Sequence, residues 1–139
     1  MINNFSGESR YYFPSNFYPV EIKFDGITYP SVEHAYQAAK TLDKDERYKI
    51  LIVGSPGEAK KLGRKLKLRE NWEENKIEVM LFLLRQKFDY PKFKKWLLET
   101  GEEHLEEGNW WGDRFWGTCN GVGENWLGRL LMQVREEIK

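Results

Sequence analysis

The stretch SVEHAYQAAK, residues 31–40, decides the fold class of this 139-residue chain. Ser31 has the side chain of a good helix N-cap. After it, apolar residues follow the i, i+3, i+4, i+7 spacing of an amphipathic helix, at Val32, Ala35, Tyr36 and Ala39. The stretch therefore predicts a helix that begins after Ser31 and turns one face to the core.

Helical signatures continue downstream of this stretch. Ser55-Pro56-Gly57-Glu58 is a capping box with proline at the first helical position, and it predicts a helix that runs to about Leu66. Apolar stripes with their terminators predict three further helices, over residues 70–88, 91–101 and 125–138. We therefore predict a mainly α fold, with five to seven helices in a single compact domain over residues 1–139.

Three segments depart from the helical pattern. Residues 21–29 predict a small N-terminal β-hairpin, because Asp25-Gly26 between two short apolar runs is a strong two-residue turn signal. Residues 10–19 combine aromatics with two prolines, and residues 101–124 are rich in Gly, Trp and Asn without any regular period. We expect residues 10–19 and 108–125 to form the walls of a pocket.

Composition excludes several classes of function. Lys+Arg and Asp+Glu are equal at 22 each, so no global field draws the chain to nucleic acid or anionic lipid. No signal-peptide core or membrane-spanning apolar run is present. The single cysteine, Cys119, excludes an internal disulfide and fits a reducing compartment. We expect a cytoplasmic protein with no cofactor and no structural metal, since phosphate-loop, dinucleotide and zinc spacings are all missing.

One polar row accompanies the apolar stripe of residues 31–40. Glu33, Gln37 and Lys40 lie at i, i+4 and i+7, at one edge of that stripe. Groups at such an edge face either a pocket beside the core or the solvent. In the first case Glu33 is a fixed negative charge, because the first helical turn favours an ionised carboxylate. In the second case the row is a solvated helix flank.

A second candidate carboxylate, Asp113, stands among Trp110, Trp111 and Trp116. A partly desolvated carboxylate between aromatic faces suits the binding of a base or the stabilisation of a cation. The alternative is a turn in which Asp113 accepts hydrogen bonds from backbone amides.

A basic run follows the capping box and comprises Lys60, Lys61, Arg64, Lys65, Lys67 and Arg69. Such a run binds a substrate phosphate or a nucleic-acid backbone, or it is simply a solvated surface. Arg64 is the strongest candidate in it, because it follows Gly63, where a backbone or a ligand can approach closely.

Together these segments resemble the NADAR family of YbiA-like proteins over nearly the whole chain. The most specific motifs are Ser-x-Glu-His-x-Tyr-Gln-x-x-Lys at residues 31–40 and Asp-x-x-Trp-Gly at residues 113–117. Further matches lie at residues 14–17, 26–29, 55–64, 72, 87–88, 98–101 and 123–132.

The resemblance implies a mainly helical fold and N-glycosidase activity. It implies as substrates either ribosylated pyrimidine intermediates of riboflavin synthesis or ADP-ribose attached to guanine in nucleic acid. The family's functional positions correspond here to Glu33, Trp72, Asp113 and Trp116, with Lys40 as a further candidate. We assign catalysis to Glu33, Asp113 and Lys40, and expect substrate binding by Trp72, Trp116, Asn16, Phe17, Tyr36, Gln37, Arg64 and Asn125.

The implied chemistry suits these residue types. Cleavage of a C–N glycosidic bond develops positive charge on the ribose, which a nearby carboxylate stabilises. We expect Glu33 on the sugar side, and Asp113 either activating water or serving the departing ring. Trp72 and Trp116 would stack on the base. Lys40 would polarise the sugar or form a Schiff base with its ring-opened aldehyde.

The expected partner is a small phosphorylated ribosyl substrate, and no membrane. ADP-ribosylated nucleic acid is the alternative substrate, and a non-catalytic binder of nucleotides or ADP-ribose is the alternative of a different class. The sequence leaves the oligomeric state open.

Overall fold

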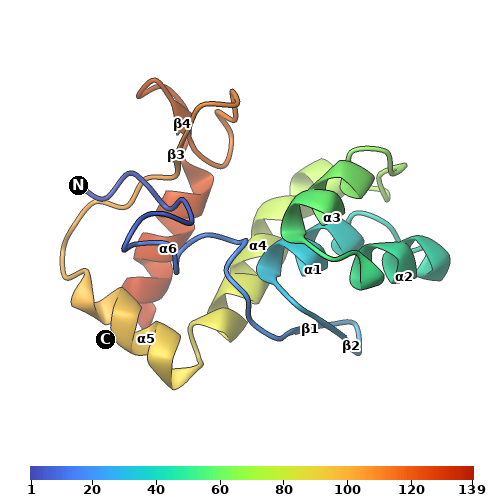
Figure 1. Ribbon diagram of the computed structural model, residues 1–139, viewed down its shortest axis with the longest axis horizontal. Coiled ribbons are helices and arrows are strands. Elements are labelled where there is room, and N and C mark those ends of the chain that lie inside the picture. The colour runs from blue at the N-terminus through green and yellow to red at the C-terminus, as the bar shows by residue number, and fades with distance from the viewer. The chain divides into compact units, whose positions relative to one another are not determined.

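The computed structural model describes all 139 residues, Met1–Lys139, and confirms the mainly α fold (Figure 1). The chain divides into two compact units, one formed by Asn16–Lys87 and the other by Met1–Ser15 together with Phe88–Lys139. The prediction of one domain over residues 1–139 stays a prediction. None of the helices has the length and apolar composition that a bilayer crossing requires.

The unit of residues 16–87 begins with the predicted hairpin. Strand β1 (Ile22–Phe24) pairs antiparallel with β2 (Ile27–Tyr29), with Ile22 opposite Tyr29. Asp25 and Gly26 both have positive φ, at 48° and 81°, as a two-residue turn of this kind requires. The side chains of Ile22 and Tyr29 are fully buried, so the hairpin closes one side of the core beside α1 (Val32–Ala39).

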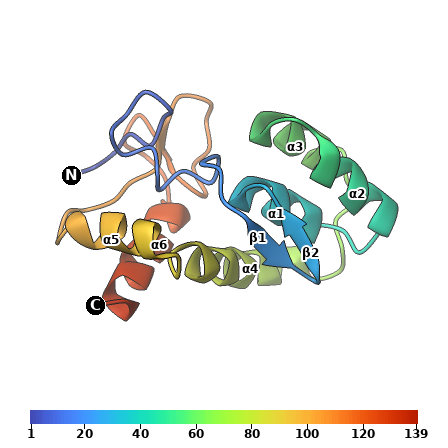
Figure 2. The same ribbon diagram turned by 60° about the horizontal axis from the view of Figure 1, so that its bottom comes forward.

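Helix α1 is the centre of this unit. It packs against the hairpin and against α2 (Lys44–Ile52), α3 (Pro56–Gly63) and α4 (Trp72–Lys87), as Figures 1 and 2 show. The Ser31 hydroxyl caps it by accepting a hydrogen bond from the amide of His34, as predicted. All eight residues of α1 are buried, so its polar face is covered as well as its apolar stripe.

The sequence patterns located most of the elements but not all of their ends. Helix α3 ends at Gly63 instead of Leu66, and α4 begins at Trp72 instead of Glu70. Helix α2 was not predicted, because its sequence is mostly charged and only Arg47 and Ile50 are buried. Asp43 caps it by accepting from the amides of Asp45 and Glu46, so an Asp-x-x-Glu box was the available signal.

The second unit holds α5 (Pro91–Glu99), α6 (Trp126–Glu137) and two very short strands. Strand β3 (Gly108–Asn109) runs parallel to β4 (Thr118–Cys119), within the segment expected to be irregular throughout. Its apolar core includes Phe88, Phe93, Leu97, Leu105 and Leu131. Residues 10–15 contribute turns without helix or strand, as expected for this proline-containing segment.

Candidate active site

The predicted site residues are divided between the two units. Residues 16–87 hold Asn16, Phe17, Glu33, Tyr36, Gln37, Lys40, Arg64 and Trp72, whereas the other unit holds Asp113, Trp116 and Asn125.

The first half of the polar row on α1 is a buried carboxylate–amide pair. Glu33 is 7% exposed and Gln37 is 3% exposed. Gln37 Nε2 donates to Glu33 Oε1 at 3.0 Å, the contact that i, i+4 spacing permits. Their burial excludes the solvated-flank alternative for these two residues. A buried carboxylate keeps a strong field, because little water screens it.

Lys40, the third member of the row, follows the last turn of α1 and is half-buried. Burial lowers its pKa, while the Glu33 carboxylate opposes that effect and the positive charges of Lys76, Arg64 and Lys60 add to it. Its Nζ lies 5.5 Å from the centre of the Tyr36 ring. A lysine with a lowered pKa is a better nucleophile near neutral pH, because more of it is the free amine.

Two aromatic side chains stand beside this row. The rings of Tyr36 and Trp72 lie 5.5 Å apart between centroids and are tilted by 51°. Tyr36 is 6% exposed and Trp72 is 3% exposed, so both rings belong to the core. The stacking of Trp72 on a base stays a prediction.

The loop before the hairpin meets the N-terminus of α1. The Asn16 carbonyl accepts a hydrogen bond from the amide of Glu33 at 3.1 Å, and Asn16 Nδ2 lies 3.6 Å from Met80 Sδ. Asn16 Oδ1 is buried and has no donor, which is unusual for a buried acceptor. Phe17 beside it is half-buried. The backbone of Asn16 is thus hydrogen-bonded to the backbone of Glu33, one of the residues assigned to catalysis.

In the other unit Asp113 shapes a turn. Its Oδ1 accepts from the amides of Phe115 at 3.0 Å and Trp116 at 2.9 Å. The Asn109 side chain spans the same loop, since its Nδ2 donates to the Asp113 carbonyl at 2.8 Å and its Oδ1 accepts from the Asp113 amide at 3.1 Å. The turn role considered for Asp113 is therefore present, and neither amide engages its second oxygen, Oδ2.

The aromatic residues around Asp113 are unequally covered. Trp110 is 86% exposed and Trp111 is 46% exposed, whereas Trp116 is half-buried with its ring 4.9 Å from that of Phe115. Asn125 is buried, and its side chain joins the Leu105 carbonyl (2.9 Å) to the Glu107 amide (3.0 Å). In this structure Asn125 connects segments of the backbone, and its substrate-binding role stays a prediction.

Sequence reasoning missed a fully buried lysine as a candidate site residue. Lys87, the last residue of α4, is fully buried, and burial lowers its pKa to about 7. Its Nζ lies 6.0 Å from the centre of the Tyr18 ring. The available signal was its position three residues after the apolar Leu84, on the core side of the helix, where a lysine is unusual.

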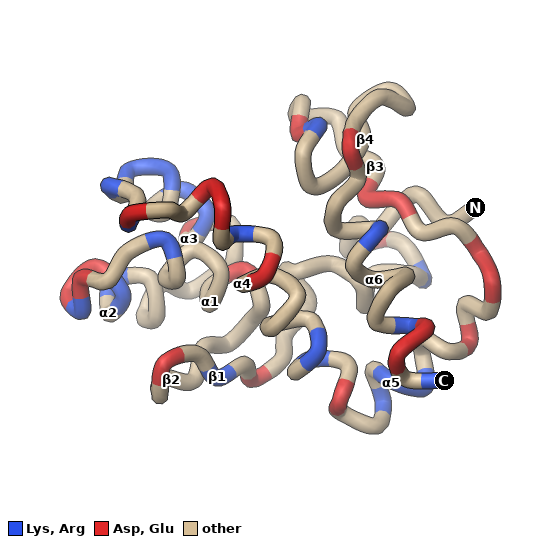
Figure 3. The backbone as a smooth tube through the Cα atoms, turned by 180° about the vertical axis from the view of Figure 1, so that it is seen from behind, with Lys and Arg blue, Asp and Glu red and all other residues tan.

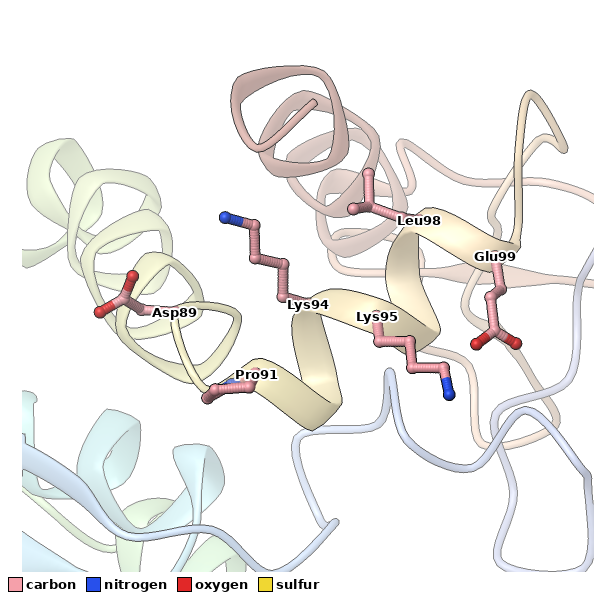
Figure 4. Close-up of a pocket in the computed structure, with 6 residues that line it drawn as sticks. All are labelled: Asp89, Pro91, Lys94, Lys95, Leu98 and Glu99. Carbon is pink, nitrogen blue, oxygen red and sulfur yellow. The ribbon is translucent and has the colours of Figure 1, made fainter.

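Other parts of the chain have fewer features of an active site. An open pocket on α5 is lined by Asp89, Pro91, Lys94, Lys95, Leu98 and Glu99 (Figure 4). These residues are exposed, apart from the half-buried Leu98, and none belongs to the predicted site. No group of three or more His, Cys, Asp or Glu side chains is arranged to hold a metal ion.

Known proteins are similar to this chain over nearly its whole length. N-glycosidase YbiA of Escherichia coli strain K12 is 41% identical over 145 residues, which covers 99% of this chain and 88% of the relative. The NMR structure of E. coli YbiA matches with a TM-score of 0.87 and 41% identity, covering 99% of this chain and 84% of that one.

A longer relative matches through a part of its length. A riboflavin biosynthesis protein of Vibrio vulnificus is 40% identical over 131 residues, covering 91% of this chain and 35% of the relative. The NADAR domain itself matches residues 4–139. The chain therefore belongs to the NADAR domain family.

Proposed function

We propose that this chain, an N-glycosidase of the NADAR family, cleaves the bond between a heterocyclic base and a phosphorylated ribose. The proposed substrate is a ribosylaminopyrimidine phosphate of riboflavin biosynthesis. The observation that carries the proposal is the buried Glu33–Gln37 pair, with Lys40 at the C-cap of the same helix. The names of relatives support it, since one is an N-glycosidase and another a riboflavin biosynthesis protein.

Glu33 is the proposed electrostatic catalyst. As the C–N bond lengthens, positive charge spreads over the ribose ring carbon and oxygen, and a fixed carboxylate lowers the energy of that state. Water then adds to the anomeric carbon and loses a proton, while the base leaves with the bonding electron pair and takes up a proton. The burial of Glu33 supports this role, because a screened surface carboxylate would stabilise the transition state far less.

Lys40 is the proposed second group on the sugar side. Its lowered pKa supports a nucleophilic role toward the ring-opened aldehyde, in which a Schiff base forms with loss of water. Borohydride added during turnover would reduce that adduct to a stable amine. Because Lys87 also has a lowered pKa, peptide mapping of the adduct is needed to tell the two lysines apart. A wild-type rate in Lys40→Ala with no adduct would remove Lys40 from the mechanism.

Asp113 is retained as the candidate that activates water or serves the departing ring. Its Oδ1 is held by two amides, which fixes the orientation of the carboxylate, and Oδ2 is the atom proposed to act.

A second candidate substrate is ADP-ribosylated guanine in DNA or RNA. The basic run on and after α3 favours it, and Figure 3 shows several positively charged segments of the backbone near α3. Against it, positive and negative charges are equal over the whole chain. Binding to an oligonucleotide through this run would weaken steeply as salt is raised.

One experiment decides between these substrates. Purified protein is incubated in parallel with a ribosylaminopyrimidine phosphate and with a guanine-ADP-ribosylated oligonucleotide, and the products are read by mass spectrometry. Release of ribose 5-phosphate from the first alone is the expected result. Release of ADP-ribose from the second alone would replace the proposed substrate with the alternative. Turnover of neither would overturn the proposal and favour a non-catalytic binder.

A further inference from the structure

A glycine on α3 lies against the amide that holds Glu33. Gly63 is the last residue of α3, and a Cβ added to it would come within 2.6 Å of Gln37 Cδ and closer still to Gln37 Oε1. Gly63 does not have a positive φ, so its backbone conformation does not demand glycine. What demands glycine is space, because the Gln37 side chain occupies the volume that any side chain at position 63 would fill.

The hydrogen bond to Glu33 fixes which end of the Gln37 amide faces Gly63. Oε1 faces the backbone of α3 at Gly63, is buried, and accepts no hydrogen bond. Nε2 points the other way and donates to Glu33 Oε1. The reverse orientation would set two acceptor oxygens against each other, which is unfavourable.

A buried acceptor without a donor destabilises the fold, so packing alone does not account for a glutamine here. An apolar side chain of similar shape would fill the same space without an unsatisfied oxygen. The group that uses the amide is Glu33, the carboxylate with the catalytic assignment.

We propose that Gln37 is a positioning residue that orients the Glu33 carboxylate, and that Gly63 leaves the space on the neighbouring helix that the Gln37 amide needs to reach it. This inference rests on the proposed function of Glu33. It differs from a substrate-binding role for Gln37, because both ends of the amide are directed at protein atoms.

The test uses Gln37→Met, which keeps the length and apolar stem of the side chain and removes the donor, and Gly63→Ala, which displaces the amide. Gly57→Ala is the matched control on the same helix, since a Cβ there would meet only Ser55 Oγ at an ordinary 3.9 Å. For each variant, kcat, KM, the pH–rate profile and the melting temperature are measured with the ribosylaminopyrimidine phosphate.

Gln37→Met and Gly63→Ala should each lower kcat about 10- to 100-fold, the range expected when a catalytic group is misplaced by a fraction of an ångström to an ångström. The acid limb of the profile should move to higher pH in both, because a carboxylate that loses a donor is protonated more readily. KM should stay near the wild-type value, and Gly57→Ala should behave as wild type. In the background of Glu33→Gln, the change Gln37→Met should cost no further activity.

Two results would overturn the inference. A raised KM with an unmoved acid limb in Gln37→Met would assign Gln37 to substrate contact. A lowered melting temperature with wild-type kcat and profile would assign it to packing alone. If the wild-type protein turns over no substrate, the proposed function fails separately. In that case the titration midpoint of the Glu33 carboxyl carbon, followed by NMR in wild type and Gln37→Met, tests the positioning contact, and an unmoved midpoint rejects it.

Discussion

Helix α1 and the loop of residues 109–117 both carry motifs of the family, yet they use their polar groups in opposite ways. On α1 the carboxylate of Glu33 is buried and receives a hydrogen bond from another side chain. On the loop the carboxylate of Asp113 is turned to its own backbone, while Trp110 beside it is 86% exposed.

The difference indicates which of the two carboxylates is the stronger candidate for a functional role. A turn is satisfied by any short acceptor at the right position, so Asp113 has a local reason to be present. Glu33 is favoured by its place in the first turn of α1, but its burial carries a desolvation cost that a carboxylate in a solvated turn does not have. A buried carboxylate that interacts electrostatically with a lysine of lowered pKa is a frequent feature of functional sites, which makes Glu33 the stronger functional candidate.

The largest effect that would test this contrast is loss of the Glu33 charge. Glu33→Gln should lower kcat at least about 100-fold, because the neutral amide no longer stabilises the cationic transition state. The melting temperature should stay near or above that of the wild type, since a buried charge is removed. The measurement is steady-state kinetics with thermal unfolding, and Glu74→Gln, an exposed carboxylate in the first turn of α4, is the control. A near-normal rate in folded Glu33→Gln protein would break the contrast.

The next effect separates the two roles of Asp113. Asp113→Asn keeps an oxygen for the amides of Phe115 and Trp116, so stability should change little, whereas kcat should fall about 100-fold if the charge acts on water or on the departing ring. Asp113→Ala also removes the turn acceptor and should cost about 1 kcal/mol of unfolding free energy. Kinetics and chemical denaturation of both variants provide the readouts. A wild-type rate in Asp113→Asn would mean that the Asp113 side chain only shapes the turn, and the contrast with Glu33 would become stronger.

The sequence could predict α1 but not its complete burial. Apolar spacing located the helix, and Ser31 located its start, because both signals are local. Glu33 and Gln37 contact the backbone of Asn16 and of Gly63, which lie 17 and 26 residues away along the chain, and no periodicity within α1 predicts these contacts. The close approach expected at Gly63 was correct, although the group that approaches is Gln37.

The loop was predicted less completely for a related reason. Its richness in Gly and Trp predicted an irregular segment. The pairing of β3 with β4 and the hydrogen bonds of the Asn109 side chain to the Asp113 backbone were not predicted, because they join residues that only the folded chain brings together. The turn at Asp113 was predictable as an alternative, since an aspartate that accepts from amides two and three residues ahead is a local signal.

A smaller effect should appear in the pH dependence of stability, through His34 on α1. Burial lowers the pKa of His34, which the Val53 carbonyl and the charge of Glu58 only partly oppose. The Val53 carbonyl can only accept, so His34 Nε2 carries the proton in the neutral ring (3.3 Å), and Nδ1 accepts from the Ser31 hydroxyl (2.7 Å). Protonation of the ring would remove that acceptor at the cap of α1.

The sign of the pH dependence follows from this lowered pKa. The unfolded chain binds a proton at the ordinary histidine pKa of about 6.5 while the folded chain does not. The contribution of His34 is therefore fully present above about pH 6.5 and is lost as the pH falls from there toward the folded-state pKa, with a slope of at most about 1.4 kcal/mol per pH unit. Denaturation from pH 7.5 to 5 should show this slope in the wild type and a shallower one in His34→Gln.

The smallest effect on stability is expected at the exposed Trp110. Trp110→Ser should change the unfolding free energy by no more than about 0.5 kcal/mol, because the side chain is 86% exposed and packs mainly against Trp111. Chemical denaturation measures it, with Trp72→Phe as the contrasting change in the core beside α1. If Trp110→Ser were as destabilising as a core substitution, the loop would depend on Trp110 for its fold, and its exposure would not mark a surface free to meet a ligand. If stability is unchanged while KM for the ribosyl substrate rises, the exposed ring contributes to substrate binding, and the loop joins α1 as a functional region through its aromatic surface instead of its carboxylate.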